Sequence, residues 1–303
     1  MARCQFRKLD GILLLDKPLG MSSNKALQEA RFLFAAEKAG HTGSLDPLAS
    51  GMLPLCFGEA TKVSGFLLDA DKRYVTTARF GYTSNTGDEE GDKQLVQAHP
   101  NISSEKLEAV LAQFRGEIQQ TPPMYSALKK DGQPLYKLAR QGIEVERALR
   151  TVVIHELKLL DCSADTATLE VQCSKGTYIR SLVEDIGAAL GVGAYVTSLR
   201  RTAVSPFNSL PMYSLATLLA LKEQQERLDE LLLPVDQALI HLPKLDLNEA
   251  ESLLIQQGQK IILESNTQSG LYRLYKKINE QAQFMGMGEV SNNVLRVKRL
   301  LAY

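Results

Sequence analysis

The sequence predicts an α+β protein with a mixed, mainly antiparallel sheet flanked by helices, plus a small β-rich module at the C-terminus. Strand-like and helix-like segments follow one another without a regular βαβ alternation, and residues 167–173 alternate apolar and polar side chains as a half-buried antiparallel strand does. Composition changes near residue 243, where an acidic, leucine-rich stretch ends in two prolines. We therefore expect one domain at 1–242 and a second at 243–303 that leans on it, because about 60 residues are near the lower limit for an independent core.

The first third of the chain combines two strands and two helices with a long loop. Residues 11–15 are an apolar run that predicts a buried strand, and Ser22 or Ser23 would cap the helix that follows. Residues 40–62 hold four glycines and two prolines, which predict a loop that becomes helical only near 59–68. Residues 74–80 are β-branched and aromatic, which favours a strand, and the polar stretch 81–93 favours a loop.

The remaining elements are predicted in the same way. Ser103 would cap a helix reaching Phe114, two prolines keep 121–127 irregular, and a turn at 131–132 precedes a short helix at 135–140. We expect strands at 151–160 and 167–173, then a helix opened by Thr177 and ended by Gly191. Beyond residue 243 the pattern predicts a helix at 247–257 and strands near 270–275, 284–290 and 294–301.

Composition excludes several classes of protein. Four cysteines at 4, 56, 162 and 173 and four histidines at 41, 99, 155 and 241 show neither zinc spacing nor a disulfide framework, so we expect no metal and free thiols in a reducing cytoplasm. No apolar run reaches membrane-spanning length, and the basic N-terminus lacks the apolar segment of a signal peptide. The chain also contains no Walker loop and no Gly-x-Gly-x-x-Gly after a strand.

Charge alone says little about partners, because Lys+Arg and Asp+Glu are equal at 35. Basic residues do recur in small groups that a fold could gather on one face to meet a polyanion, although scattered basic pairs are commonly solvated surface. These groups are Lys72-Arg73, Lys129-Lys130, Arg147 with Arg150, Arg200-Arg201, Lys276-Lys277 and Arg296 with Lys298 and Arg299.

One carboxylate stands in the middle of the glycine-rich loop. Asp46 precedes Pro47, which pushes it toward an extended or turn conformation, so its side chain can point out of the backbone path. An aspartate that only shapes the turn is the simpler interpretation. His41, five residues earlier, can make a structural hydrogen bond or stack on a nucleobase.

A second candidate pair follows the strand break at Lys175-Gly176. Tyr178 and Arg180 project to the same side while the chain is extended, so they act together only if the helix starts late. Arg180 has apolar neighbours and needs a carboxylate if it is buried. Asp46 is one candidate partner, and a contact with Arg180 would keep its carboxylate ionised and fix the direction of its oxygens. Glu184 and Asp185 are candidates that lie closer in sequence.

Six motifs in the sequence resemble those of one known enzyme family. Residues 40–54, Gly-His-Thr-Gly-Ser-Leu-Asp-Pro-Leu-Ala-Ser-Gly-Met-Leu-Pro, resemble the catalytic motif of the bacterial tRNA pseudouridine synthases of the TruB type. Five further motifs keep the family's order between residues 11 and about 205, and the tail resembles the family's PUA-like RNA-binding module. They are Asp16-Lys17-Pro18 with Gly20, Ser22 and Ser23; Asp71-Lys72-Arg73-Tyr74; residues 123–129; residues 173–180; and Leu199-Arg200-Arg201.

The resemblance implies a pseudouridine-synthase-like fold and the isomerisation of the T-arm uridine of tRNA (tRNA position 55) to pseudouridine. The N1–C1′ bond would break, the uracil would turn, and it would rejoin through C5. Site roles follow from the family pattern: Asp46 as the essential carboxylate, Arg180 as its partner, Tyr74 against the base and able to take the C5 proton, Tyr178 and Leu199 lining the pocket, and His41 bracing the space that flipped nucleotides leave.

The chemistry agrees with these roles. A base inside a structured loop must be extruded, and aromatic rings can stack on it for roughly 1–3 kcal/mol. Glycosidic cleavage calls for a carboxylate, whose role stays open: attack on C1′, attack on C6, or removal of a C2′ proton. An isomerisation without redox change needs no cofactor. We expect tRNA as the partner of a monomer, with Lys129-Lys130 and Arg200-Arg201 on its phosphates.

Two other classes of function compete with this one. A non-catalytic tRNA-binding or folding module would flip bases without chemistry, and a glycosidase or base-excision enzyme would release free uracil.

Overall fold

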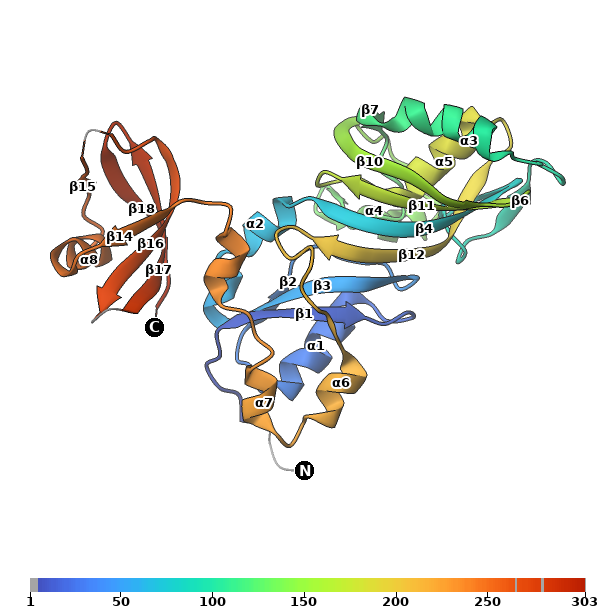
Figure 1. Ribbon diagram of the computed structural model, residues 1–303. Helices are drawn as coiled ribbons and strands as arrows, with labels where there is room; N and C mark the ends of the chain where they lie inside the picture. Colours follow the sequence, from blue (N-terminus) through green and yellow to red (C-terminus); the bar gives the residue numbers. More distant parts are fainter. Residues whose placement is uncertain (1–4, 265, 279–280, 303) are drawn as a thin grey trace.

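The computed structural model describes residues 5–264, 266–278 and 281–302 (Figure 1). Within these ranges the main body is built on a mixed sheet of nine strands, in the order β13-β1-β3-β12-β4-β11-β10-β7, with β2 paired to β3. The pairs β1–β13 and β3–β12 are parallel and the others antiparallel, which confirms the predicted fold class. The strands are β1 Gly11–Lys17, β2 Ala39–His41, β3 Ala49–Phe57, β4 Lys72–Phe80, β7 Gly116–Gln120, β10 Arg150–Cys162, β11 Thr166–Cys173, β12 Ala194–Val204 and β13 Tyr213–Ser214.

The helices of the main body begin where the sequence supplies caps. The hydroxyl of Ser22 accepts from Lys25 N at 3.2 Å and that of Ser103 from Lys106 N at 3.2 Å, as predicted. The elements are α1 Ser23–Leu33, α2 Ser64–Asp69, α3 Ser104–Leu111, α4 Leu135–Ala139, α5 Ile179–Ala189, α6 Leu215–Ala220 and α7 Gln225–Asp229, with 3-10 turns η1 Gly58–Lys62, η2 Ala112–Phe114 and η3 Val235–Leu239.

Strand β1 is buried on both faces. Leu13 and Leu15 pack with α1 and α6 on one side of the sheet, whereas Ile12 and Leu14 pack with η1, α2 and η3 on the other. Figure 1 shows α1 and α6 together beside β1. This double burial explains why the predicted strand is continuously apolar rather than alternating.

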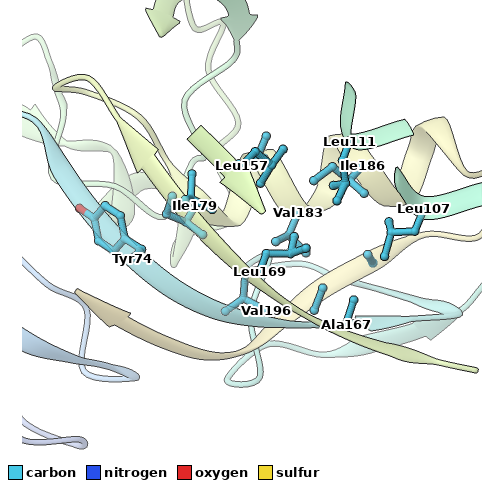
Figure 2. Close-up of a cluster of buried hydrophobic side chains, with 14 of the residues drawn as sticks. Tyr74, Leu107, Leu111, Leu157, Ala167, Leu169, Ile179, Val183, Ile186 and Val196 are labelled. Atoms are coloured by element: carbon cyan, nitrogen blue, oxygen red, sulfur yellow. The ribbon is translucent and has the colours of Figure 1, made fainter. Parts of the chain in front are cut away.

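The other half of the sheet carries a second core. Helices α3 and α5 cover β4, β11, β10 and β12, so that Leu111 and Ile186 meet side chains such as Leu169 from the sheet. Figure 2 shows Tyr74 at the end of this cluster, with its hydroxyl directed away from the aliphatic side chains. The core therefore holds the ring of Tyr74 and leaves its polar end for the site described below.

The prediction of a loop over residues 40–62 is wrong for residues 49–57, which form the buried strand β3. Gly51 has φ +99°, and a Cβ there would lie 2.2 Å from the Arg201 carbonyl oxygen, so glycine allows β12 to approach closely. The Pro54 carbonyl accepts from Thr42 N at 3.1 Å. In an antiparallel pair the N–H and C=O of one residue face the same neighbouring strand, and those of Pro54 face β2. The missing N–H of this proline therefore removes no hydrogen bond between β3 and β1.

Several strands have no counterpart in the sequence prediction. Central strand β12 and edge strands β7 and β13 were not predicted, and two small hairpins interrupt predicted loops: β5 Tyr82–Ser84 with β6 Lys93–Leu95, and β8 Lys129–Lys130 with β9 Gln133–Pro134. Helix α5 begins at Ile179 rather than Thr177. Most of these segments are short or polar, and their pairing depends on partners far away in sequence.

The C-terminal part is a five-stranded sheet in the order β14-β16-β17-β18-β15, beside the main sheet in Figure 1. Three residues of this small sheet contribute side chains to the core around η1 and η3: Tyr275, Phe284 and Met287. The small sheet therefore packs against the main body, as expected. No helix in the described ranges is long and apolar enough to cross a membrane. The elements are β14 Lys244–Leu247, α8 Glu249–Gln256, β15 Ile261–Ile262, β16 Gly270–Ile278, β17 Gln281–Ser291 and β18 Val294–Leu300.

Candidate active site

The loop between β2 and β3 presents Asp46 at the surface of the main sheet. Ser23, at the start of α1, donates its hydroxyl to Leu45 O at 2.9 Å and accepts from Leu45 N at 2.7 Å. The Asp46 carbonyl accepts from Ala49 N at 3.0 Å. Leu45 and the main chain of the aspartate itself are thus held in place, while the aspartate side chain remains 47% exposed.

Arg180 is the partner of Asp46. The sequence left three acids open as the partner of this arginine, and the family resemblance implied Asp46. Its Nη2 lies 2.9 Å from Asp46 Oδ2, and its side chain is only 6% exposed. Nη1 donates to Thr86 O and Nη2 to Tyr125 O, both at 2.7 Å. These main-chain carbonyls orient the guanidinium independently of Asp46, so the arginine is already in place to aim the carboxylate.

The late start of α5 brings Tyr178 to the same place. Tyr178 is the residue before the helix, in extended conformation with φ −101° and ψ 113°. Gln120, 2% exposed at the end of β7, accepts from Tyr178 N at 3.1 Å and donates to Tyr178 O at 3.2 Å. Gln120 is a positioning residue that the sequence analysis missed, and no local pattern distinguishes it.

A second carboxylate, Asp88, also faces Arg180. Its Oδ2 lies 3.4 Å from Arg180 Nη1, and its side chain is 5% exposed. Asp88 Oδ1 accepts from the Thr86 hydroxyl at 2.5 Å and from Glu90 N at 3.1 Å. Arg180 therefore bridges one exposed and one buried carboxylate. The sequence assigned no role to Asp88, which lies in the polar stretch 81–93 that was predicted only as a loop.

The predicted site residues surround two adjoining cavities. One of about 290 Å³ is lined by Asp46, Tyr74, Tyr178, Arg180 and Leu199, among others. The second, of about 390 Å³, shares Asp46 and Arg180 and includes His41, Tyr125 and Tyr136. Asp46 thus lies where the two spaces meet. The structure brings five of the six predicted residues together around the first cavity and places His41 in the second.

Burial determines the protonation of several side chains here. Burial lowers the pKa of His41, and the nearby charge of Arg201 acts in the same direction, which favours the neutral imidazole. Burial raises the pKa of Tyr74, whereas Arg201 beside it acts in the opposite direction. Burial also raises the pKa of Tyr178. Both phenols are therefore neutral near pH 7 and suited to stacking.

The phosphate-binding role expected for Arg200-Arg201 is not supported. Arg200 donates from both terminal nitrogens to Asp16, at 2.9 and 2.8 Å, and Arg201 is 1% exposed. The buried guanidinium of Arg201 cannot meet a backbone phosphate, and that of Arg200 is already paired with a carboxylate. Lys129 and Lys130, on β8, are exposed and remain available for such a contact.

No three His, Cys, Asp or Glu side chains converge as a metal site requires within the ranges that the structure describes. Cys56, Cys162 and Cys173 are free thiols, and Cys4 lies outside the described residues.

Glu184 provides a pH-dependent test of this region. Burial raises its pKa to about 7, although Arg180 nearby opposes the shift. The folded protein then holds the proton more tightly than the unfolded chain, so stability falls as pH rises from about 4.5 to 7. We expect Glu184→Gln to stabilise the protein by about 2 kcal/mol at pH 8 and by little at pH 5. Urea unfolding at both pH values measures this, with the exposed Glu223→Gln as control. Parallel pH profiles for Glu184→Gln and wild type would contradict the assignment.

The mixed main sheet with its small C-terminal sheet is the fold of a pseudouridine synthase, an isomerase, as the matches of this chain to family models of these enzymes show. The chain belongs to the TruB family of these enzymes. Its residues 31–179 match the family model "TruB family pseudouridylate synthase (N terminal domain)". Residues 180–240 match "tRNA pseudouridylate synthase B C-terminal domain", and residues 243–301 match "Pseudouridine synthase II TruB, C-terminal".

Similar proteins agree with this membership. The chain is 52% identical over 297 residues to the "tRNA pseudouridine synthase B" of Azoarcus sp. (strain BH72), covering 98% of this chain and 96% of the relative. It is 51% identical over 300 residues to the protein of that name from Ectopseudomonas mendocina (strain ymp), with 98% and 96% covered. A chain of the "Crystal Structure of a Cbf5-Nop10-Gar1 Complex" has the same fold at TM-score 0.73 and 26% identity, covering 98% of this chain and 85% of that one.

Proposed function

We propose that this protein isomerises the T-arm loop uridine of tRNA (tRNA position 55) to pseudouridine, with Asp46 as the essential carboxylate. The observation that carries the proposal is the partly exposed Asp46, held 2.9 Å from Arg180 at a cavity lined by Tyr74, Tyr178 and Leu199. The relatives named tRNA pseudouridine synthase B, which align along nearly the whole chain, support tRNA as the substrate. Such a substrate implies a cytoplasmic enzyme.

The two sheets belong to parts of the chain with different proposed functions. We assign residues 1–242 to catalysis and residues 243–303 to a PUA-like module that binds RNA, in an enzyme that acts as a monomer. The exposed basic residues Lys277, Arg296 and Lys298 belong to the second part. Phosphate contacts from such side chains would position the tRNA without reading its sequence.

Base flipping brings the uridine to Asp46. A uracil inside the T-loop stack cannot enter the cavity beside Asp46, so the nucleotide must be extruded into it. The rings of Tyr74 and Tyr178 can stack on it, each for roughly 1–3 kcal/mol. His41 in the adjoining cavity would brace the space that the displaced nucleotides leave. Its neutral imidazole is suited to stacking or hydrogen bonding there.

The reaction exchanges one bond for another. The N1–C1′ bond breaks, the uracil turns within the cavity, C5 bonds to C1′, one proton leaves C5, and one proton arrives at N1. Asp46 takes part by attacking C1′, attacking C6 or removing the C2′ proton, and Arg180, 2.9 Å away, orients its carboxylate for any of these steps. The Tyr74 hydroxyl is the group that takes the C5 proton.

Tritium release tests the proposal. Unmodified tRNA labelled at C5 of uridine is incubated with the protein, and the product is mapped after digestion to nucleosides. We expect release of about one tritium per tRNA at the T-loop position, and none from a transcript with cytidine there. Binding without release would instead indicate a non-catalytic RNA-binding module, and free uracil in the products would indicate a glycosidase.

A further inference from the structure

Two buried cations bound the cavity beside Asp46 in addition to Arg180. Arg201 is 1% exposed and Lys72 is 9% exposed, and both line the same cavity as Asp46 and Tyr74. In the parts of the chain that the structure describes, no carboxylate oxygen lies within 4.0 Å of either side chain. The carboxylate that lines this cavity, Asp46, already has its partner in Arg180. The cavity wall therefore carries positive charge that the protein does not neutralise directly.

Arg201 is held firmly in this position. Its backbone pairs with Gly51 of β3 on one side and with Tyr74 of β4 on the other. Nε donates to Met52 O at 2.7 Å, and Nη2 donates to Gly43 O at 3.1 Å. A guanidinium carries five N–H groups, so these two bonds orient it and leave donors for the Tyr74 hydroxyl and for a ligand in the cavity.

Lys72 is restrained in a similar way. Its Nζ donates to Leu68 O at 2.9 Å and to Ala70 O at the end of α2. Burial lowers its pKa to about 8, Arg201 acts in the same direction, and Asp69 and Asp71 act in the opposite one. Keeping two such cations out of water costs several kcal/mol. A site offsets this cost when negative charge arrives with the ligand or develops on it.

We propose that Arg201, assisted by Lys72, stabilises the uracil as an anion between breakage of the N1–C1′ bond and formation of the C5–C1′ bond. This inference rests on the function proposed above. When N1–C1′ breaks, its electron pair stays on N1, and the charge spreads over O2 and O4. When C5 attacks C1′, the pair forms the new bond and the ring becomes neutral, with hydrogen still on C5. Loss of that proton and protonation of N1 complete the isomerisation.

The cations favour the reacting state over the bound substrate. A neutral uridine gains little from a nearby guanidinium, whereas the departing anion gains a charge-assisted hydrogen bond. Arg180 cannot supply this alone, because it is shared between Asp46 and Asp88. Arg201 is thereby a catalytic residue that acts on the departing base.

Leaving-group chemistry tests this directly. Single-turnover rates with saturating enzyme are compared for wild type, Arg201→Met and Arg201→Lys on tRNA transcripts containing uridine or 5-fluorouridine. N1–C1′ cleavage is followed by digestion to nucleosides and chromatography. We expect Arg201→Met to slow the uridine reaction about 10²- to 10³-fold while the dissociation constant for tRNA changes little. Arg201→Lys should recover part of the rate. 5-Fluorouracil is a stronger acid than uracil, so its anion depends less on a neighbouring cation. The slowdown caused by Arg201→Met should therefore be about tenfold smaller with 5-fluorouridine than with uridine.

The control is Arg79→Met, on the same strand as Tyr74. Arg79 pairs with Asp165 at the surface, 2.9 Å away, and should not change either rate. A wild-type enzyme that cleaves neither substrate would overturn the proposed function itself. With an active wild type, an unslowed Arg201→Met, or a slowdown that is equal for both bases, overturns only the role of Arg201. If Arg201→Met does not bind tRNA, Arg201→Lys and Lys72→Met undergo the same comparison, and equal slowdowns again overturn the proposal.

Discussion

Asp46→Asn is expected to abolish pseudouridine formation while leaving tRNA binding nearly intact. The amide keeps the shape of the side chain but supplies neither a nucleophile nor a base, whichever of the three routes Asp46 takes. The loss should be on the order of 10⁴-fold or more, the size seen when a reacting group is removed. The side chain is 47% exposed, so its neutralisation should cost little stability.

The measurement is C5 tritium release under single-turnover conditions, together with the dissociation constant for tRNA. Asp165→Asn is the matched control, because Asp165 also pairs with an arginine but lies at the surface with Arg79. It should retain wild-type rate. Equal tritium release by Asp46→Asn and wild type would remove Asp46 from the chemistry and end the mechanism proposed here.

Arg180→Met is expected to impair both stability and activity. The substitution leaves Asp88, 5% exposed, without its cation, and it removes the donors to Thr86 O and Tyr125 O. Breaking a buried ion pair from one side typically costs about 3–5 kcal/mol of unfolding free energy. Activity should fall about 10²- to 10³-fold in addition, because Asp46 loses the charged partner that orients its carboxylate.

A double variant separates the two effects. Arg180→Met combined with Asp88→Asn removes the uncompensated buried charge, so urea unfolding should show part of the stability restored. Tritium release should stay low, because Asp46 still lacks its partner. Arg115→Met, at a surface pair with Glu108, is the control and should cost less than about 1 kcal/mol. Recovery of activity in the double variant would show that Arg180 supports the fold and not the reaction.

Local patterns predicted the regular elements well where propensity and burial agree. Ser22 and Ser103 cap helices as expected, and β4 and β11 fall on the segments whose side chains alternate. Strand β3 shows the limit of such reasoning. Its glycine and prolines favour a loop, and it is a strand only because β1 and β12 pair with it and accept the close approach at Gly51.

The candidate site divides in the same way. Asp46, Tyr74, Tyr178 and Leu199 could be named from sequence motifs, because each stands in a short pattern whose spacing resembles that of a known family. Residue spacing alone narrowed the partner of Arg180 to three acids, and the family resemblance implied that it is Asp46. Asp88 was missed, because its role depends on burial beside a residue from α5.

The sequence by itself determined the fold class, the family resemblance and most of the residues that line the first cavity, since these depend on residue types at short spacings. The tertiary structure decided which charges are buried. It placed Arg200 in a surface pair with Asp16 and Arg201, its neighbour, in the wall of the cavity. Adjacent residues on a strand point to opposite faces, and what each face meets depends on segments far away in the chain. A charge becomes costly, and useful for chemistry, only when those segments exclude water from it.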